Sequence, residues 1–272
     1  MSALATTRTI TTRRAITCQV LVLGDPDAPP LVSFHGFTGH LAAEPTLQRL
    51  AEHFLVHAPV WPGYGAEPGE ELIEDMSDFA LHGADVVDAL GLGAAHGGRP
   101  PHLIGHSMGA MIAAEMAAMA PQSYGRLVLL APLGLWLAEH PIGDVFSMLP
   151  YEFPQQLFHD PVSGAAAMTG GLDFDDPAAI KTFLIGNSRR LGTAGKIMFP
   201  IPNRRLAKRL YRLVNDVLVV WGESDRLVPP IYGREWVRLL PHGRLAYIEA
   251  AGHMVPYERP DEVAALVTDF LA

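Results

Sequence analysis

Three residues of the types used in nucleophilic catalysis stand in short glycine-containing motifs that are far apart in the sequence. Ser107 lies in GHSMG between Gly105 and Gly109, Asp225 lies in GESDRLVPP, and His253 lies in AGHMVP. A serine hydroxyl becomes a strong nucleophile when a histidine takes its proton, and a carboxylate must hold that histidine in the right tautomer. The order serine, aspartate, histidine therefore predicts one catalytic constellation.

The residues around Ser107 predict a sharp strand-to-helix turn. The short apolar stretch before it suits a buried strand, and the following MGAMIAAEMAAMA is rich in helix formers and ends at Pro121. Glycine at positions 105 and 109 would let the backbones of strand and helix approach closely. A glycine-rich turn with an incidental serine is the alternative, so the rest of the chain must decide.

A second turn, HGFTG at 35–39, follows the apolar stretch LVSF. Its glycines allow the backbone to turn so that the N–H of Phe37 points into the site. A tetrahedral intermediate needs two such donors for its oxyanion. We expect the second donor to be the N–H of Met108, directly after the serine.

The elements needed to position these motifs alternate along the chain, which predicts a mostly parallel sheet covered by helices on both faces. The expected strands are about 6–12, 16–24, 31–36, 54–60, 102–106, 126–132, 216–222 and 244–249. The expected helices are about 44–53, 76–90, 108–120, 231–240 and from 260 onward.

Residues 132–213 break this alternation, because they are rich in proline, phenylalanine and short helical patterns. We expect an α/β core made of 1–131 and 214–272, with 132–213 inserted as a helical lid (cap). The lid would cover the carboxyl-terminal edge of the sheet, where open α/β sheets bind ligands.

Composition limits the classes of partner. The 272 residues are 49% hydrophobic, which fits one large domain, and the net charge of −9 argues against nucleic acid and anionic membrane as partners. No apolar run reaches the length of a membrane span. The single cysteine, Cys18, cannot form an internal disulfide, so we expect strand packing for it and a reducing, cytoplasmic location.

Taken together, GHSMG after a strand, HG before the first crossover, GESD after the penultimate strand and GH after the last strand resemble the α/β-hydrolase fold. The resemblance covers nearly everything outside 132–213. It implies that Ser107, Asp225 and His253 are catalytic, that Phe37 and Met108 form the oxyanion hole, and that neither cofactor nor metal takes part. Glu223, two residues before Asp225, is the alternative acid.

A serine at the strand-to-helix turn of residues 105–109, which we call the elbow, disfavours the dehalogenases and epoxide hydrolases that resemble this chain. Those relatives carry aspartate at this position. Carbon–carbon hydrolases usually show a glycine-proline-glycine turn and an asparagine before the serine, whereas this chain has GFTG and His106. We therefore favour hydrolysis of a carboxylic ester. Carbon–carbon hydrolase, lactonase and perhydrolase activity stay open as alternatives, as does a non-catalytic small-molecule receptor.

The lid sequence suggests what the substrate looks like. Its aromatic residues predict a small, predominantly apolar substrate, and they include Trp136, Phe146, Tyr151, Phe153, Phe158 and Phe183. Arg189 and Arg190 are candidates for gripping a substrate carboxylate. His35, beside the oxyanion turn, is either a substrate contact or a structural residue. His102 and His106 are four apart, which on a strand does not favour a shared metal ion.

Overall fold

The centre of the molecule is a mixed β-sheet. Within residues 5–41, 44–93, 98–170, 172–173, 175–199 and 205–272, which the computed structural model describes, the sheet has eight strands in the order β1-β2-β4-β3-β5-β6-β7-β8. β1 and β4 pair antiparallel with β2, and the remaining neighbours are parallel. The strands are β1 (Ala5–Thr11), β2 (Thr17–Leu23), β3 (Pro30–Phe34), β4 (Leu55–Pro59), β5 (His102–His106), β6 (Leu127–Leu130), β7 (Val217–Gly222) and β8 (Gly243–Ile248).

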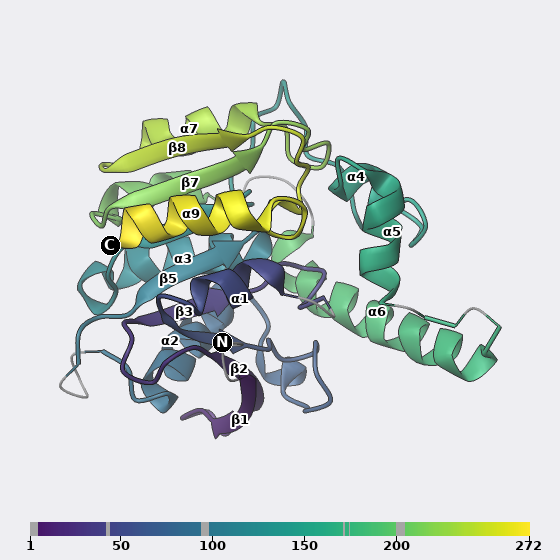
Figure 1. Ribbon diagram of the computed structural model, residues 1–272, viewed down its shortest axis with the longest axis horizontal. Helices are drawn as coiled ribbons and strands as arrows, with labels where there is room; N and C mark the ends of the chain where they lie inside the picture. The colour runs from purple at the N-terminus through teal and green to yellow at the C-terminus, as the bar shows by residue number, and fades with distance from the viewer. Residues whose placement is uncertain (1–4, 42–43, 94–97, 171, 174, 200–204) are drawn as a thin grey trace.

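Helices cover both faces of this sheet (Figure 1). Apolar residues of α2, α3 and α7 form one core cluster with the sheet, those of α1 and α9 form a second, and a small third cluster joins α2 to β1 and β2. The predicted α/β fold with a mostly parallel sheet is therefore confirmed. The helices are α1 (Pro45–Leu50), α2 (Met76–Ala89), α3 (Met108–Met119), α4 (Phe153–Leu157), α5 (Pro161–Thr169), α6 (Pro177–Met198), α7 (Ile231–Leu239), α8 (Val255–Glu258) and α9 (Pro260–Leu271).

Strand β7 shows why the central strands are apolar without interruption. Val219 and Trp221 belong to the cluster on the α3 and α7 face, whereas Leu218 and Val220 belong to the cluster on the α1 and α9 face. Because successive side chains of a strand point to opposite faces, a strand buried on both sides needs an apolar residue at every position.

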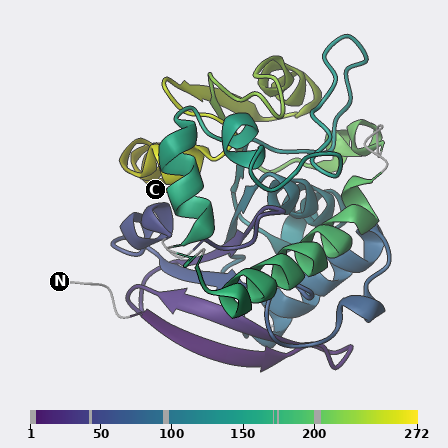
Figure 2. The ribbon, with the colours of Figure 1, turned by 90° about the vertical axis from the view of Figure 1, so that its right-hand side faces the viewer.

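Residues 132–213, which we call the inserted segment, connect β6 to β7 and contain α4, α5 and α6. These helices lie beyond the carboxyl ends of the parallel strands (Figures 1 and 2). The sequence predicted only short helices here, but α6 is continuous over 22 residues. Asp176 caps its first turn, and Gly186, Gly192 and Gly195 lie inside it, where they weaken the helical sequence pattern.

Two further sequence expectations concern single features. Cys18 is buried in β2, and burial raises the pKa of its thiol to about 11, which fits strand packing. Among the helices of the described residues, none is at once long enough and apolar enough to cross a membrane.

Candidate active site

Ser107 occupies the sharp turn between β5 and α3. Its φ of 54° and ψ of −115° are a backbone conformation that costs a non-glycine residue about 1–3 kcal/mol. A Cβ atom at position 105 would lie 2.6 Å from the Cα of Ala110, and one at position 109 would collide with the carbonyl oxygen of His35. The expected need for glycine at both positions is therefore confirmed.

The structure brings the three residues of the expected constellation into hydrogen-bond contact. His253 Nε2 lies 2.8 Å from Ser107 Oγ, and His253 Nδ1 lies 2.8 Å from Asp225 Oδ2. The Ser107 and His253 residues are fully buried, and Asp225 is 5% exposed. With the Nδ1 proton donated to the carboxylate, Nε2 is the nitrogen that can accept the serine proton.

The carboxylate of Asp225 is held by a network of its own. Its Oδ1 atom accepts hydrogen bonds from the N–H groups of Leu227 (3.0 Å) and Val228 (2.9 Å). Its Oδ2 atom also accepts one from the indole N–H of Trp221 at 3.1 Å. The sequence indicated Trp221 only as a core residue of a strand; its position four residues before the acid was the available signal.

Glu223, the alternative acid, has an exposed side chain. The loop after β7 instead turns so that Asp225, three residues past Gly222, faces His253. The geometry thus favours Asp225 as the partner of the histidine.

The two expected oxyanion donors flank Ser107. Phe37 follows β3, and its ring lies beside the ring of His253 with 6.4 Å between the centroids. Within the described part of the chain, neither the Phe37 N–H nor the Met108 N–H donates a hydrogen bond to another protein group. Both donors are therefore free for an oxyanion.

Two histidines, His35 and His106, hold the oxyanion turn and the His253 loop in place through hydrogen bonds. His106 Nε2–H donates to the carbonyl oxygen of His253 at 2.8 Å, and burial lowers the pKa of His106 to about 3, which keeps its ring neutral. His35 Nδ1–H donates to the Gly36 carbonyl at 2.8 Å, and its Nε2 accepts from the Trp61 N–H at 3.1 Å. Of the two roles considered for His35, this geometry supports the structural one.

The larger of two apolar cavities near this site has a volume of about 370 Å³, and its lining is almost wholly apolar. Phe37 and Leu41 contribute from the oxyanion side, Phe153 from α4, Met168 from α5, and Phe183 from α6. Phe153, a predicted substrate contact, is thus placed on the cavity wall. Trp136 is half-buried and lines neither of the two apolar cavities, so its substrate contact stays a prediction that this geometry does not support.

Arg190 is the charged residue on the wall of this cavity. Its guanidinium donates to the Thr38 carbonyl (3.1 Å) and to Asn187 Oδ1 (3.3 Å), and its buried Nε has no partner among the described residues. Burial lowers the pKa of Arg190, because no carboxylate compensates for the lost hydration. A buried guanidinium with spare donors is suited to an anionic or strongly polar group.

Arg189 has a different environment. It forms a bidentate ion pair with Glu70 (2.6 and 2.7 Å) and donates to the carbonyl oxygens of Gly65 and Glu67. These contacts fasten α6 to the segment after β4. Four hydrogen bonds occupy most of the five N–H donors of Arg189, so this geometry supports a structural role, and a substrate contact at Arg189 stays a prediction.

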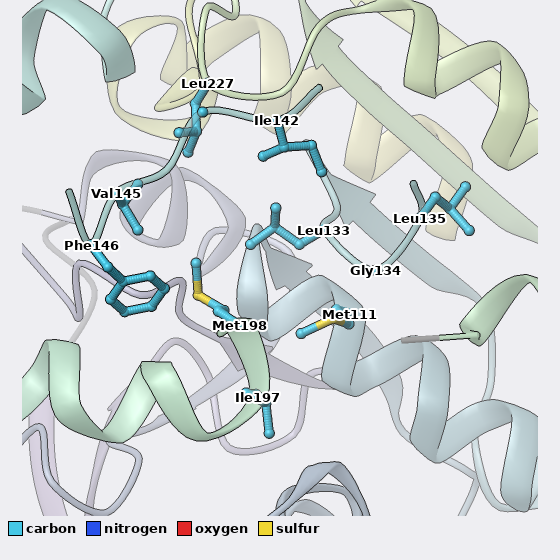
Figure 3. A pocket seen from close by; sticks show the side chains of 11 residues that line it. Met111, Leu133, Gly134, Leu135, Ile142, Val145, Phe146, Ile197, Met198 and Leu227 are labelled. Atoms are coloured by element: carbon cyan, nitrogen blue, oxygen red, sulfur yellow. The ribbon is translucent and has the colours of Figure 1, made fainter. Parts of the chain in front are cut away.

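The smaller apolar cavity has a volume of about 30 Å³ and is lined by apolar side chains (Figure 3). Two of its lining residues adjoin the site directly: Leu133 N–H donates to the Ser107 carbonyl, and Leu227 N–H donates to Asp225. Figure 3 shows Ile142, Val145 and Phe146 around the same space.

Comparisons with known proteins agree with this architecture. The chain is 28% identical over 241 residues to a 2-hydroxy-6-oxo-6-phenylhexa-2,4-dienoate hydrolase of Burkholderia cepacia, covering 82% of this chain and 79% of that one. It is 26% identical over 269 residues to an sn-1-specific diacylglycerol lipase of Mus musculus, with coverage of 93% and 84%. The structure of a carboxylesterase from Bacillus subtilis superposes with a TM-score of 0.73 at 20% identity, with coverage of 99% and 92%.

A family model that matches most of the chain identifies the family. A model of the alpha/beta hydrolase family matches residues 31–266, which include β3 through most of α9 and all the motifs described above. The chain therefore belongs to the alpha/beta hydrolase family.

Proposed function

We propose that the protein is a serine hydrolase that cleaves carboxylic esters through an acyl-enzyme on Ser107. The observation that carries this proposal is the continuous hydrogen-bonded series from Ser107 Oγ through the His253 ring to Asp225, with both contacts at 2.8 Å. Proton transfer needs heavy atoms about 2.6–3.2 Å apart, so this geometry is competent for general-base catalysis.

In the proposed reaction, Ser107 Oγ attacks the ester carbonyl carbon while its proton passes to His253 Nε2. Asp225 stabilises the imidazolium that forms, and the N–H groups of Phe37 and Met108 stabilise the oxyanion. Collapse of the tetrahedral intermediate breaks the bond to the alkoxy group, which leaves as an alcohol with the proton from His253. Water then repeats these steps on the acyl-enzyme, which releases the acid and restores Ser107.

We further propose that the inserted segment acts as a lid. Ser107 and His253 are fully buried, so a substrate reaches them only when part of the surrounding chain moves. The inserted segment supplies most of the wall of the larger cavity, through α4, α5 and α6. This arrangement supports a role in both covering the site and selecting the substrate.

The larger cavity supports a predominantly apolar substrate with one polar or anionic group. Its wall is apolar apart from a few groups such as Thr38, Asn187 and Arg190. Arg190 has donors to spare, and they suit a carboxylate or a carbonyl oxygen. We therefore place the acyl or alcohol chain of the ester against the α4–α6 wall and its polar group at Arg190.

Arg190 also favours a second candidate function, hydrolysis of a carbon–carbon bond in a ring-cleavage product. The relative from Burkholderia cepacia is named for a dienoate substrate, which carries a carboxylate. That substrate class would use the same serine, histidine and aspartate. The ester remains our first choice because the chain has His106 where carbon–carbon hydrolases usually have asparagine, and GFTG where they usually have a glycine-proline-glycine turn.

A substrate panel tests the proposal. Turnover is measured on activated esters of short and medium acyl chains, a lactone, and ring-cleavage dienoates, for the parent, for Ser107→Ala, and for the matched surface control Ser123→Ala. We expect ester hydrolysis that falls by about three decades or more in Ser107→Ala and is unchanged in Ser123→Ala. Faster turnover of dienoates than of every ester would establish the second candidate. Turnover that survives Ser107→Ala contradicts both.

A further inference from the structure

The chain between α4 and α5 lies against the loop that carries Asp225. Arg226, the next residue after the acid, donates from Nη1 to the carbonyl oxygens of Gln155 (2.9 Å) and Phe158 (2.8 Å). On the other side of the acid, Ser224 Oγ is hydrogen-bonded to His159 Nδ1 at 2.8 Å. Both neighbours of Asp225 are therefore tied to the inserted segment.

The same stretch also contacts the loop that carries His253. Glu258 accepts the Gly252 N–H on Oε2 (2.7 Å) and the His159 N–H on Oε1 (2.6 Å), so one carboxylate joins the two segments. Met254 N–H donates to the Leu157 carbonyl at 3.0 Å. A Cβ atom at position 252 would lie 2.6 Å from the Leu157 carbonyl oxygen, so glycine is required for this approach.

Residues 155–159 thus bond to the chain neighbours of both Asp225 and His253. We propose that residues 155–159, bound through Arg226 and Glu258, are a brace that sets the distance between the Asp225 carboxylate and the His253 ring, and that Arg226 and Glu258 are positioning residues for catalysis. This inference rests on the proposed serine hydrolase function.

The environment of Glu258 supports this role. The carboxylate is half-buried, and burial raises its pKa, while hydrogen bonds from backbone N–H groups, including those of Gly252 and His159, offset part of that shift. Its position is consequently defined by the two segments it joins. The His253 loop is also held on its opposite side, because His106 donates to the His253 carbonyl. The His253 loop is therefore held between the brace on one side and His106, directly before Ser107, on the other.

The brace also divides the inserted segment by function. Residues 155–159 must stay in place for the Asp225–His253 contact to persist, so any movement that admits substrate occurs elsewhere in the segment. A displacement of about 1 Å in a catalytic group can cost about a hundredfold in rate, which sets the size of the expected effect.

The test compares Arg226→Met, which removes the donor, with Arg226→Lys, whose ammonium can still reach both carbonyl oxygens. Arg238→Met is the matched control, because this arginine is paired with Glu235 on α7 and, among the described residues, hydrogen-bonds to neither loop. We expect Arg226→Met to lower kcat on an activated ester about tenfold to a hundredfold with KM within threefold. Arg226→Lys should recover at least half of that loss on a logarithmic scale, and Arg238→Met should match the parent.

Glu258→Gln provides the second arm, with Glu235→Gln as its control. The carboxamide can accept only one of the two N–H groups, so we expect about a tenfold loss in kcat and faster amide hydrogen exchange at Gly252 and His159. A double-mutant comparison tests the route of the effect. In an Asp225→Asn background, Arg226→Met should cost less than twofold, because the contact that it positions is already lost.

Three results would overturn the brace: kcat within twofold of the parent for both Arg226→Met and Glu258→Gln, no recovery in Arg226→Lys, or an undiminished Arg226→Met effect in the Asp225→Asn background. Each variant is measured well below its Tm, so that unfolding does not imitate the loss. The parent's dependence on Ser107 is established first. If Ser107→Ala keeps the parent rate, the proposed function fails together with the brace. If turnover depends on Ser107 but the Arg226 and Glu258 variants keep the parent kcat, the brace alone is refuted.

Discussion

His253 Nε2 lies 2.8 Å from Ser107 Oγ, although 146 residues separate the two along the chain. The contact exists because Ser107 follows β5 and His253 follows β8, and the carboxyl ends of parallel strands meet at one edge of the sheet. The inserted segment lies between them in sequence but outside the sheet, so its length does not disturb the contact.

Asp225→Asn should preserve the fold and lower turnover of an activated ester by as much as about 10⁴. An asparagine amide donates where the carboxylate accepted, so the His253 proton moves to Nε2, the nitrogen that must receive the serine proton. Steady-state kinetics at the plateau pH measure the loss.

Glu223→Gln is the matched variant for the same loop, because Glu223 is exposed and two residues away. We expect it to stay within about tenfold of the parent, since only Asp225 contacts His253. A severe loss in Glu223→Gln with a mild one in Asp225→Asn would reassign the acid.

Arg190→Met should weaken binding of esters that carry a carboxylate about tenfold to a hundredfold in KM, and change neutral esters of similar size less than threefold. The reason is that Arg190 lines the larger cavity with donors to spare. Arg238→Met is the control, because this arginine pairs with Glu235 on α7 and is not among the residues that line the cavity. Equal effects of Arg190→Met on charged and neutral esters would remove the substrate role of Arg190.

Phe146→Ala should widen the smaller cavity and raise the relative kcat/KM for esters with a bulkier group on that side. A methylene in such a pocket is worth about 1–3 kcal/mol of discrimination, so a shift of about tenfold in the ratio of bulky to small substrates is expected. Tyr211→Ala, which changes an exposed aromatic side chain outside the cavity lining, serves as the control. An unchanged ratio in Phe146→Ala means that substrates do not use the smaller cavity.

Acid should destabilise the fold through histidines that are buried without hydrogen bonds. His82 is one: both ring nitrogens lack a hydrogen-bond partner among the described residues, and burial lowers its pKa from 6.5 to about 4. Between these pH values the unfolded chain binds the extra proton, so the free energy of unfolding falls as the pH falls. One such group accounts for about 2 kcal/mol at pH 5.

Urea unfolding at pH 8 and pH 5 measures this linkage. In His82→Leu, the loss of stability between the two pH values should be smaller than in the parent by about 2 kcal/mol. His242→Leu, at an exposed position, should leave the pH dependence unchanged. If His82→Leu and the parent lose the same amount, His82 is not a source of the acid sensitivity.

Much of the site was predictable because its information is local. Each of Ser107, Asp225 and His253 follows a recognisable strand, and a parallel sheet brings such positions together. The glycines of the elbow were predictable for the same reason, since any side chain at position 109 would collide with the neighbouring backbone.

The substrate contacts were less predictable because they depend on how helices are rotated. Arg189 and Arg190 are consecutive, so they point about 100° apart on α6. Which of them faces the cavity is decided by the ion pair with Glu70, which is 119 residues from Arg189. Trp136 is a related case: it lines neither apolar cavity, because aromatic composition does not specify which side chains converge on a cavity.

The central claim, that Ser107 is the nucleophile activated by His253, is tested most directly by covalent labelling. The parent is treated with a fluorophosphonate, and the adduct is counted by intact mass and located by peptide mass spectrometry. We predict one adduct per chain, on Ser107, with no labelling of Ser107→Ala and much slower labelling of His253→Ala. An adduct on another residue, or labelling of Ser107→Ala at the parent rate, would contradict the assignment.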